Sequence, residues 1–296
     1  MTSPGLSYIV PAFNEEGAIV ATVERLRVVL AGLGLPYEII IVDDGSRDRT
    51  REQVESLGFV RVVRHAVNIG YGSAIKSGIK AAKHDWIGIV DADGTYDIES
   101  LPRLVEKMRE GYDMVVGARA NVSELDSLAK KFFRQTLIGF LNLVVAGRIE
   151  DPNSGFRIFT KEMALFFFPF LCHTFSFTTS LTVFAFGERF FVSYVSVNYG
   201  SRTGKSKVHH FRDSLRMIQL VLQGITFFNP VKFYLMLSIA LIAGVLAPSL
   251  VILAAGFASF AAYWFATGAI VCLLVGLGVL GDIVRISGIR RSDDFR

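Results

Sequence analysis

Residues 233–281 contain no charged side chain, and this apolar tract limits the possible folds more than any other feature of the chain. As one helix it would measure roughly 70 Å at about 1.5 Å per residue, about twice the thickness of a hydrocarbon core of about 30 Å. The tract therefore predicts two membrane-spanning helices joined by a tight turn near Ala254-Ala255-Gly256. Pro248 falls inside the first span, where a kink is tolerated if neighbouring groups satisfy the freed carbonyl.

The basic residues that flank this tract predict its orientation. Lys232 precedes it, Arg285, Arg290 and Arg291 follow it, and the expected turn contains no lysine or arginine. Cytoplasmic segments next to membrane spans are enriched in these residues, so we expect the N-terminal domain and both termini in the cytoplasm. The first five residues lack the basic region of a signal peptide, which agrees with this orientation. The sequence thus predicts a protein integral to the plasma (inner) membrane.

The segment before the tract has the spacing of an amphipathic helix. Its apolar residues recur at helical intervals: Phe211, Leu215, Ile218, Leu222 and Ile225. Such a helix suits the membrane interface, although an ordinary packed helix has the same pattern. We therefore expect a cytoplasmic domain at 1–210, an amphipathic interfacial helix at 211–230, and a transmembrane hairpin with a short basic tail at 231–296.

Residues 1–160 alternate strand patterns with helix patterns, which is typical of an α/β fold. The expected strands are Leu6–Pro11, Tyr37–Val42, Phe59–Val63, Ile87–Val90 and Tyr112–Val116. The expected helices are Glu15–Ala31 with Asn14 as its N-cap, Arg49–Leu57, a helix that follows the glycine-rich turn at 68–72 and runs through Ala82, and Glu99–Met108. This order predicts a Rossmann-like, mainly parallel sheet with right-handed crossovers.

A second apolar segment, residues 164–187, is not expected to cross the membrane. Pro169, His173 and a hydroxyl-rich stretch interrupt it. A third span would also put the two basic flanks of the hairpin on opposite sides. We interpret it as a buried or membrane-leaning part of the α/β domain.

Two of the predicted strands end in acidic clusters. Asp43-Asp44 follows the strand that begins at Tyr37, and Asp91-Ala92-Asp93 follows the strand that begins at Ile87. Ligands of open α/β sheets bind outside the carboxyl ends of the strands. Paired carboxylates there suit a hard divalent cation that also carries phosphate groups, whereas the alternative is an ordinary turn rich in Asp and Gly.

Several motifs follow one another along the chain. The first three are Val10-Pro11-Ala12-Phe13-Asn14-Glu15-Glu16, Ile41-Val42-Asp43-Asp44-Gly45-Ser46 and Asp91-Ala92-Asp93. Together they resemble the GT-A fold of family-2 glycosyltransferases. Three later motifs are Gly117-Ala118-Arg119, Asp151-Pro152-Asn153-Ser154-Gly155-Phe156-Arg157 and Arg202-Thr203-Gly204-Lys205-Ser206-Lys207. They are similar to those of the polyprenyl-phosphate glycosyltransferases, including the dolichol-phosphate mannose synthases, over about residues 6–230.

The resemblance implies a binding site for a nucleotide-sugar donor. It assigns donor binding to Pro11, Phe13, Glu15, Val42, Asp44, Asp91, Ala92, Asp93, Arg119, Arg202 and Lys207. Asp91 and Asp93, with Thr95, would hold Mg²⁺ or Mn²⁺ against the donor diphosphate. Arg202 would act in catalysis with these two aspartates, since Arg202, Lys205 and Lys207 would close over the same phosphates.

The resemblance also implies a polyprenyl-phosphate acceptor, such as undecaprenyl or dolichyl phosphate. Arg119, Arg134, Ser154 and Arg157 are the candidates for its phosphate. A phosphate monoester has a second pKa near 6, so at neutral pH it is a nucleophile without a protein base. The expected function is therefore an inverting, metal-dependent transfer of a hexose from a UDP- or GDP-sugar to the lipid phosphate.

The chain departs from the family pattern at two places. Thr95 stands where these synthases usually have an amide, and Arg202 lies only two places before Gly204. The turn Asn68-Ile69-Gly70-Tyr71-Gly72 lacks the full dinucleotide-binding spacing, so we interpret it as close packing beside the donor.

Alternative functions are transfer to another lipid or to a polysaccharide, and non-catalytic binding of a nucleotide sugar at the membrane. The first is disfavoured because neither Trp86 nor Trp264 lies in the Gln-x-x-Arg-Trp motif of processive synthases. The second is disfavoured because both metal aspartates and the basic loop are present. The net charge of +4 is better explained by an anionic membrane surface than by nucleic acid, for which no motif is found. A homo-oligomer is possible.

Overall fold

The computed structural model describes residues 4–120, 147–174, 176–200 and 230–293, with scattered residues between 131 and 145. The chain separates into two compact units, Met1–Met217 and Ile218–Arg296. The expected interfacial helix at 211–230 and the basic loop with Arg202, Lys205 and Lys207 lie outside the described residues, apart from the first residue of α10.

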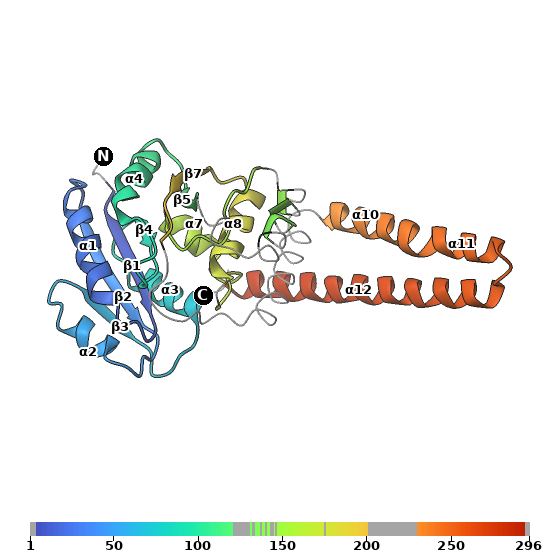
Figure 1. The fold of residues 1–296 in the computed structure, drawn as a ribbon, viewed down its shortest axis with the longest axis horizontal. Coiled ribbons are helices and arrows are strands. Elements are labelled where there is room, and N and C mark those ends of the chain that lie inside the picture. Colours follow the sequence, from blue (N-terminus) through green and yellow to red (C-terminus); the bar gives the residue numbers. More distant parts are fainter. Residues whose placement is uncertain are drawn as a thin grey trace. The chain divides into compact units, whose positions relative to one another are not determined.

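The N-terminal unit is built on a seven-stranded sheet with strand order β3-β2-β1-β4-β6-β5-β7 (Figure 1). The strands are β1 (Leu6–Ala12), β2 (Tyr37–Asp43), β3 (Arg61–Arg64), β4 (Trp86–Ile89), β5 (Met114–Arg119), β6 (Arg157–Thr160) and β7 (Val192–Val197). Strand β6 is antiparallel to both β4 and β5, whereas the other pairings are parallel. The expectation of a mainly parallel sheet is thus confirmed.

Helices pack on both faces of this sheet. On one face, α1 (Ile19–Ala31) and α4 (Leu101–Arg109) share a buried core with alternate residues of β1 and β2. Helix α3 (Tyr71–Ala81) contacts β1 and β2 and packs against Ile9, whose side chain points away from those of its neighbours Tyr8 and Val10. Further helices with described bounds in this unit are α2 (Thr50–Glu55), the 3₁₀ turn η1 (Ile98–Ser100), α7 (Lys161–Phe166) and α8 (Phe177–Gly187).

The start of α1 differs from the expectation. The sequence predicts a helix from Glu15 with Asn14 as its N-cap, but α1 begins at Ile19 and Ala18 precedes it. Asn14 has a positive φ of 51°. Its side-chain oxygen accepts a hydrogen bond from the backbone N–H of Arg47 (2.8 Å), in the loop after β2. The residue therefore links two loops instead of capping a helix.

The apolar segment 164–187 folds into the sheet-containing unit, as expected. It contributes the end of α7 and all of α8, and nine of the eleven residues of α8 are buried. A helix of this length is about half as long as the roughly 20 residues that a membrane span needs. Phe167 stacks on Phe184 with a centroid distance of 5.7 Å, which joins the two helices through their aromatic rings.

The described residues of the C-terminal unit form helices α10 (Pro230–Leu241), α11 (Ala247–Ala254) and α12 (Ala258–Asp293), with a π-helical turn, η2 (Ile242–Leu246), between the first two. Within the described residues, Tyr234–Ala254 and Ala258–Gly281 are long and apolar enough to cross a membrane. They are largely exposed in the isolated chain, as expected of surfaces that lipid covers. Two apolar helices suited to membrane anchoring are thus present, and the turn between them lies where it was expected.

The irregularity in the first span also has a local cause. The π-helical turn ends one residue before Ala247-Pro248. Proline has no backbone N–H and its ring clashes with the preceding turn, so a local widening of the helix before Pro248 is expected.

Leu26 and Val28 of α1 provide a test of the core. Leu26 is fully buried and Val28 is 71% exposed. Leu26→Ala should lower the free energy of unfolding of the N-terminal unit by about 2–5 kcal/mol, and Val28→Ala by less than about 0.5 kcal/mol. Denaturation can be followed by the fluorescence of Trp86, which lies in β4, in a Trp264→Phe background. Equal effects of the two substitutions would contradict the described packing of α1.

Candidate functional site

The expected site residues gather at one edge of the sheet. Because β1, β2, β4 and β5 run parallel, their carboxyl ends meet at this edge, and Asp44, Asp91 and Arg119 lie there. Strand β6 runs the other way, so it begins where its neighbours end. Arg157, its first residue, pairs with Ile89 of β4 and with Val116 of β5. The loop 151–156 is therefore brought to the carboxyl end of β4.

The Asp91-Ala92-Asp93 motif follows β4 and is held by nearby hydroxyl groups. Asp93 is buried, and its Oδ1 accepts hydrogen bonds from the backbone N–H (3.2 Å) and the hydroxyl (2.7 Å) of Thr95. Asp91 is only partly buried, and its Oδ1 accepts a hydrogen bond from the phenol of Tyr71 (2.8 Å). Removal from water, together with the charge of Asp91, raises the pKa of Tyr71 well above its usual value. The phenol therefore stays protonated and able to donate.

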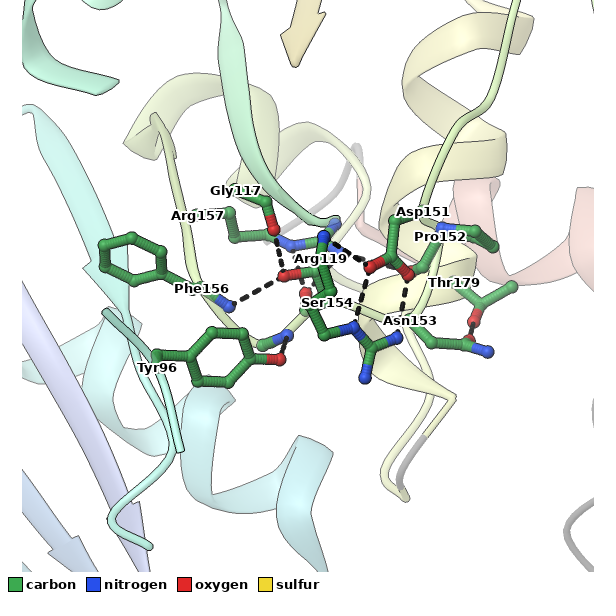
Figure 2. Close-up of polar contacts among 11 residues, drawn as sticks. Tyr96, Gly117, Arg119, Asp151, Pro152, Asn153, Ser154, Phe156, Arg157 and Thr179 are labelled. Carbon is green, nitrogen blue, oxygen red and sulfur yellow. Dashed lines mark hydrogen bonds and ion pairs between the residues drawn. The ribbon is translucent and has the colours of Figure 1, made fainter. Parts of the chain in front are cut away.

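Gly155 lies directly against the carboxylate of Asp91. A Cβ atom at Gly155 would stand 2.7 Å from both carboxylate oxygens, which is closer than a carbon atom can approach them. The backbone N–H of Gly155 donates to the phenol oxygen of Tyr96 at 2.7 Å (Figure 2). The motifs at 91–93 and 151–157 are thus parts of one site, and this contact requires glycine at position 155.

Arg119 and Asp151 form a buried ion pair beside this contact (Figure 2). Nε and Nη2 of Arg119 donate to the two oxygens of Asp151 at 2.7 and 2.8 Å, and the backbone N–H of Arg119 donates to Oδ2 at 3.2 Å. Burial alone would raise the pKa of Asp151, but the hydrogen bonds and charge of Arg119 outweigh it and lower that pKa. The pair uses Nε and Nη2, so Nη1 can still donate to an anion. The guanidinium also lies 5.2 Å from the ring centre of Tyr199.

The side chains of Ser154 and Arg157 make hydrogen bonds inside the protein. Both are fully buried. The Ser154 hydroxyl donates to the carbonyl of Gly117 at 2.6 Å. The Arg157 guanidinium donates to the carbonyls of Ser154, Pro152 and Thr178 and to the hydroxyl of Thr182. These interactions hold the 151–155 loop against β5 and α8, and contact of either residue with an acceptor phosphate stays a prediction.

The loops that follow β1 and β2 are tied together at the same sheet edge. Pro11 and Val42 are register partners in neighbouring strands, and Phe13 and Glu15 come directly after β1. The Glu15 backbone N–H donates to Thr50 Oγ1 at 2.7 Å. These hydrogen bonds hold in place the loops that contain the residues expected to bind the donor.

Asp44 is buried and already has internal partners. Its carboxylate accepts hydrogen bonds from the backbone N–H groups of Ile69 (3.0 Å) and Gly70 (2.9 Å), and lies 2.7 Å from Nδ1 of His65. Asp44 therefore fixes the glycine-rich turn, and its contact with a donor base stays a prediction.

Two further predicted parts of the site are only partly described. Burial and the charge of Arg119 lower the pKa of Arg134, and its contact with an acceptor phosphate stays a prediction. Tyr199 and Gly200 lead toward the basic loop that begins at Ser201. The Gly200 N–H donates to the carbonyl of Thr95 at 2.7 Å, and the rings of Tyr199 and Tyr96 are in edge contact at 5.0 Å. The chain thus enters the basic loop from beside Thr95.

The donor atoms at Asp91 and Asp93 fit a divalent cation that arrives with a phosphate ligand. Within the described residues, no group of three or more His, Cys, Asp or Glu side chains could hold a metal without further ligands. Mg²⁺ commonly binds one or two carboxylates and completes its shell with substrate phosphates and water. Thr95 holds Asp93 through its hydroxyl, and its direct ligation of a metal stays a prediction.

Sequence reasoning did not identify Tyr71, Tyr96 or Asp151 as parts of this site. Tyr71 stands in the glycine-rich turn, which the sequence associates with close packing only. Asp151 opens the 151–157 motif, but its pairing with Arg119 depends on β5 and β6 lying side by side. Tyrosine hydroxyls have no sequence signature of their own, so only their contacts reveal them.

Comparisons with known proteins identify the family of the chain. The sequence model of the family described as "Glycosyl transferase family 2" matches residues 7–168. The chain is 29% identical over 233 residues to dolichyl-phosphate beta-glucosyltransferase of Dictyostelium discoideum, covering 72% of this chain and 71% of that protein. It is 32% identical over 166 residues to dolichol-phosphate mannosyltransferase of Pyrococcus furiosus, covering 53% and 47%.

A third relative is undecaprenyl-phosphate 4-deoxy-4-formamido-L-arabinose transferase of Pectobacterium atrosepticum, 32% identical over 163 residues and covering 53% of this chain and 49% of that protein. The chain thus spans about half the length of two of these three relatives.

Among solved structures, glucosyl-3-phosphoglycerate synthase of Mycobacterium tuberculosis is similar in fold, with a TM-score of 0.61, 21% identity, and coverage of 75% of this chain and 80% of that one. That enzyme has also been solved in complex with Mn²⁺ and uridine diphosphate, in a structure with a TM-score of 0.58 and 22% identity that covers 75% of this chain and 80% of that one. This similarity shows the expected GT-A fold. Since the family model matches more than half of the chain, the protein belongs to glycosyltransferase family 2 and is a glycosyltransferase.

Proposed function

We propose that this protein transfers a hexose from a UDP- or GDP-sugar to a polyprenyl phosphate at the cytoplasmic face of the membrane, with inversion and with Mg²⁺ or Mn²⁺. The observation that carries the proposal is the contact of Gly155 with the carboxylate of Asp91. It joins the pair of metal-binding aspartates to the loop that carries the Arg119–Asp151 ion pair. A site for a metal-bound diphosphate and a cationic site for a second anion are therefore adjacent.

The nature of the acceptor is supported by the relatives and by the C-terminal unit. The three relatives named above act, by their names, on dolichyl or undecaprenyl phosphate. A polyprenyl chain resides in the bilayer, and this chain carries two apolar helices suited to anchor it there. The positive flanks of the hairpin support a cytoplasmic active site, where nucleotide sugars are available.

The reacting groups need little proton transfer. An oxygen of the lipid phosphate attacks the anomeric carbon, a new C–O bond forms, and the bond to the nucleoside diphosphate breaks with inversion. The phosphate is ionised at neutral pH because its second pKa is near 6, so no general base is required. Asp151 suits this scheme because its carboxylate is paired with Arg119 and its pKa is lowered, which makes it a poor base.

Electrostatics dominate such a reaction because two anionic substrates must meet. Nη1 of Arg119 and the guanidinium of Arg134 would bind the acceptor phosphate, and Arg202 and Lys207 would contact the donor phosphates. A cation held by Asp91 and Asp93 would neutralise charge that develops on the leaving diphosphate. Pro11, Phe13, Glu15, Val42 and Asp44 would line the nucleoside pocket.

A panel assay tests the substrates directly. Purified full-length protein in detergent is given labelled nucleotide sugars, Mg²⁺ or Mn²⁺, and undecaprenyl or dolichyl phosphate. Label in the organic phase identifies donor and acceptor together, and an α or β product from a donor of known configuration reports inversion or retention. A retained configuration would contradict the single-displacement mechanism, and label only in water-soluble products would contradict the lipid acceptor.

Asp93→Ala should abolish transfer because it removes one of two carboxylates available to the metal. Asp85→Ala is the matched control, since Asp85 is exposed and directly precedes β4, whereas Asp93 follows it. The control should keep wild-type turnover. Near-normal turnover of Asp93→Ala in the presence of a metal chelator would contradict the metal role.

Gly155→Ala should lower kcat roughly 100-fold, because the added methyl group must displace the carboxylate of Asp91 and small misplacements in an active site cost about that much. Gly58→Ala, at a position with open space around it, should have no effect. Steady-state kinetics and melting curves of both variants check this. Unchanged kcat in a folded Gly155→Ala protein would show that the contact with Asp91 is unimportant.

Arg134→Ala should raise the KM for the lipid phosphate about tenfold or more with a smaller effect on kcat, as expected for loss of one charge-assisted hydrogen bond. Arg51→Ala removes an arginine of α2 that pairs with Glu55, and it should leave both constants unchanged. If the substitution raised the KM for the nucleotide sugar instead, Arg134 would be assigned to donor binding and not to acceptor binding.

A further inference from the structure

We propose that Tyr71 is a positioning residue for Asp91, and that the glycine-rich turn at 68–72 serves to deliver its phenol to that carboxylate. The proposal rests on the proposed function, because the orientation of Asp91 matters through its role as a metal ligand. It assigns a role to a motif that the sequence associates with close packing only.

The glycines of the turn fix where Tyr71 lies. Gly70 has a φ of 106°, and a Cβ atom there would stand 2.6 Å from the carbonyl oxygen of His173. A Cβ atom at Gly72 would stand 2.2 Å from the carbonyl oxygen of Cys172. The backbone N–H of Ser73 donates to the carbonyl of His173 at 3.1 Å. The first turn of α3 is therefore packed backbone to backbone against residues 172–174, and Tyr71 has little freedom to move.

Asp44 fixes the same turn from the other side. Its carboxylate accepts the backbone N–H groups of Ile69 and Gly70. The turn is therefore held by β2 through Asp44 and by the 172–174 segment through its glycines. These attachments involve the residues on both sides of Tyr71. The backbone of Tyr71 is therefore positioned by the fold before a metal ion binds.

The carboxylate of Asp91 lies between this phenol and Gly155. The Tyr71 hydroxyl donates to Oδ1 at 2.8 Å, while both oxygens lie against the Cα of Gly155, where a Cβ atom would be 2.7 Å away. Gly155 is itself held by the phenol of Tyr96 at 2.7 Å. Rotation of the carboxylate is thus restricted from two sides before any ligand binds.

Restriction of this kind increases affinity for a metal. Groups that hydrogen-bond to metal ligands orient them and reduce the entropy lost on binding, and their removal commonly weakens metal binding about 10–100-fold. Tyr71→Phe keeps the ring and its packing but removes the hydrogen bond to Asp91. The expected effect is therefore on metal affinity, with little effect on folding.

Tyr8→Phe is a matched control. Tyr8 is fully buried, and its hydroxyl donates to the backbone carbonyl of Ile89 in β4 at 3.3 Å. This substitution also removes a phenol hydroxyl that hydrogen-bonds next to the Asp91-Ala92-Asp93 motif, but it does not touch the motif's carboxylates. If the loss of a hydroxyl acted only by destabilising β4, both substitutions would therefore change the Mn²⁺ dissociation constant by similar factors.

The experiment measures Mn²⁺ binding to the full-length protein in detergent by electron paramagnetic resonance, with saturating UDP and, separately, GDP. We expect Tyr71→Phe to raise the Mn²⁺ dissociation constant at least about tenfold, and Tyr8→Phe to leave it within about twofold of the wild type. Melting curves of the three proteins are recorded in parallel, and dissociation constants are referred to the folded protein.

The outcomes separate the two proposals. Equal dissociation constants for wild type and Tyr71→Phe would overturn the role of Tyr71 and leave the proposed function intact. Equal weakening in Tyr71→Phe and Tyr8→Phe would also overturn it, because the effect would then come from β4 as a whole. Absence of Mn²⁺ binding by folded wild-type protein with either nucleotide would overturn the metal-dependent function and this inference with it.

Discussion

The contact between Gly155 and the carboxylate of Asp91 is the constraint on which the rest of the site depends. It requires β6 to run antiparallel between β4 and β5, because only then does the 151–157 motif begin where β4 ends. It also requires a residue without a side chain at position 155. The single reversed strand in an otherwise parallel sheet therefore has a clear consequence, which is to bring two motifs far apart in the sequence into van der Waals contact.

The proposed function requires charges that can bind two anionic ligands near this contact. Arg119 and Asp151 neutralise each other in part, and their ion pair uses Nε and Nη2 of the guanidinium. Arg157 carries a further positive charge beneath the loop, but its N–H groups are used by carbonyl and hydroxyl oxygens. These hydrogen bonds make the loop rigid, and the buried charge adds to the positive potential beneath it.

The proposed chemistry needs positive charge near the phosphates more than it needs a general base. A sugar hydroxyl acceptor needs a base, whereas an ionised phosphate needs charge neutralisation and alignment. The membrane hairpin would keep the catalytic unit at the surface where such a lipid acceptor is found. Chemistry and anchoring therefore favour the same substrate class, although they arise from different parts of the chain.

The sequence by itself determined the elements and the chemical class. Short apolar runs marked five strands, the charge-free tract marked two spans, and the ordered motifs led to the glycosyltransferase family. The sequence did not indicate β6 and β7: β6 contains a buried arginine, and β7 follows a long, mostly apolar segment. Local sequence patterns indicate which residues are buried and with what periodicity. They were sufficient to predict helices and strands whose apolar residues follow a regular pattern.

Only the tertiary structure decided which side chains meet at the candidate site. Ser154 and Arg157 stand in the same motif as Gly155, yet they point into the protein, and Tyr71 reaches Asp91 from a turn with no chemical signature. The physical reason is that a side chain's role depends on strand direction and on contacts between distant segments. A linear motif specifies which residues are present, but it does not specify which of them meet.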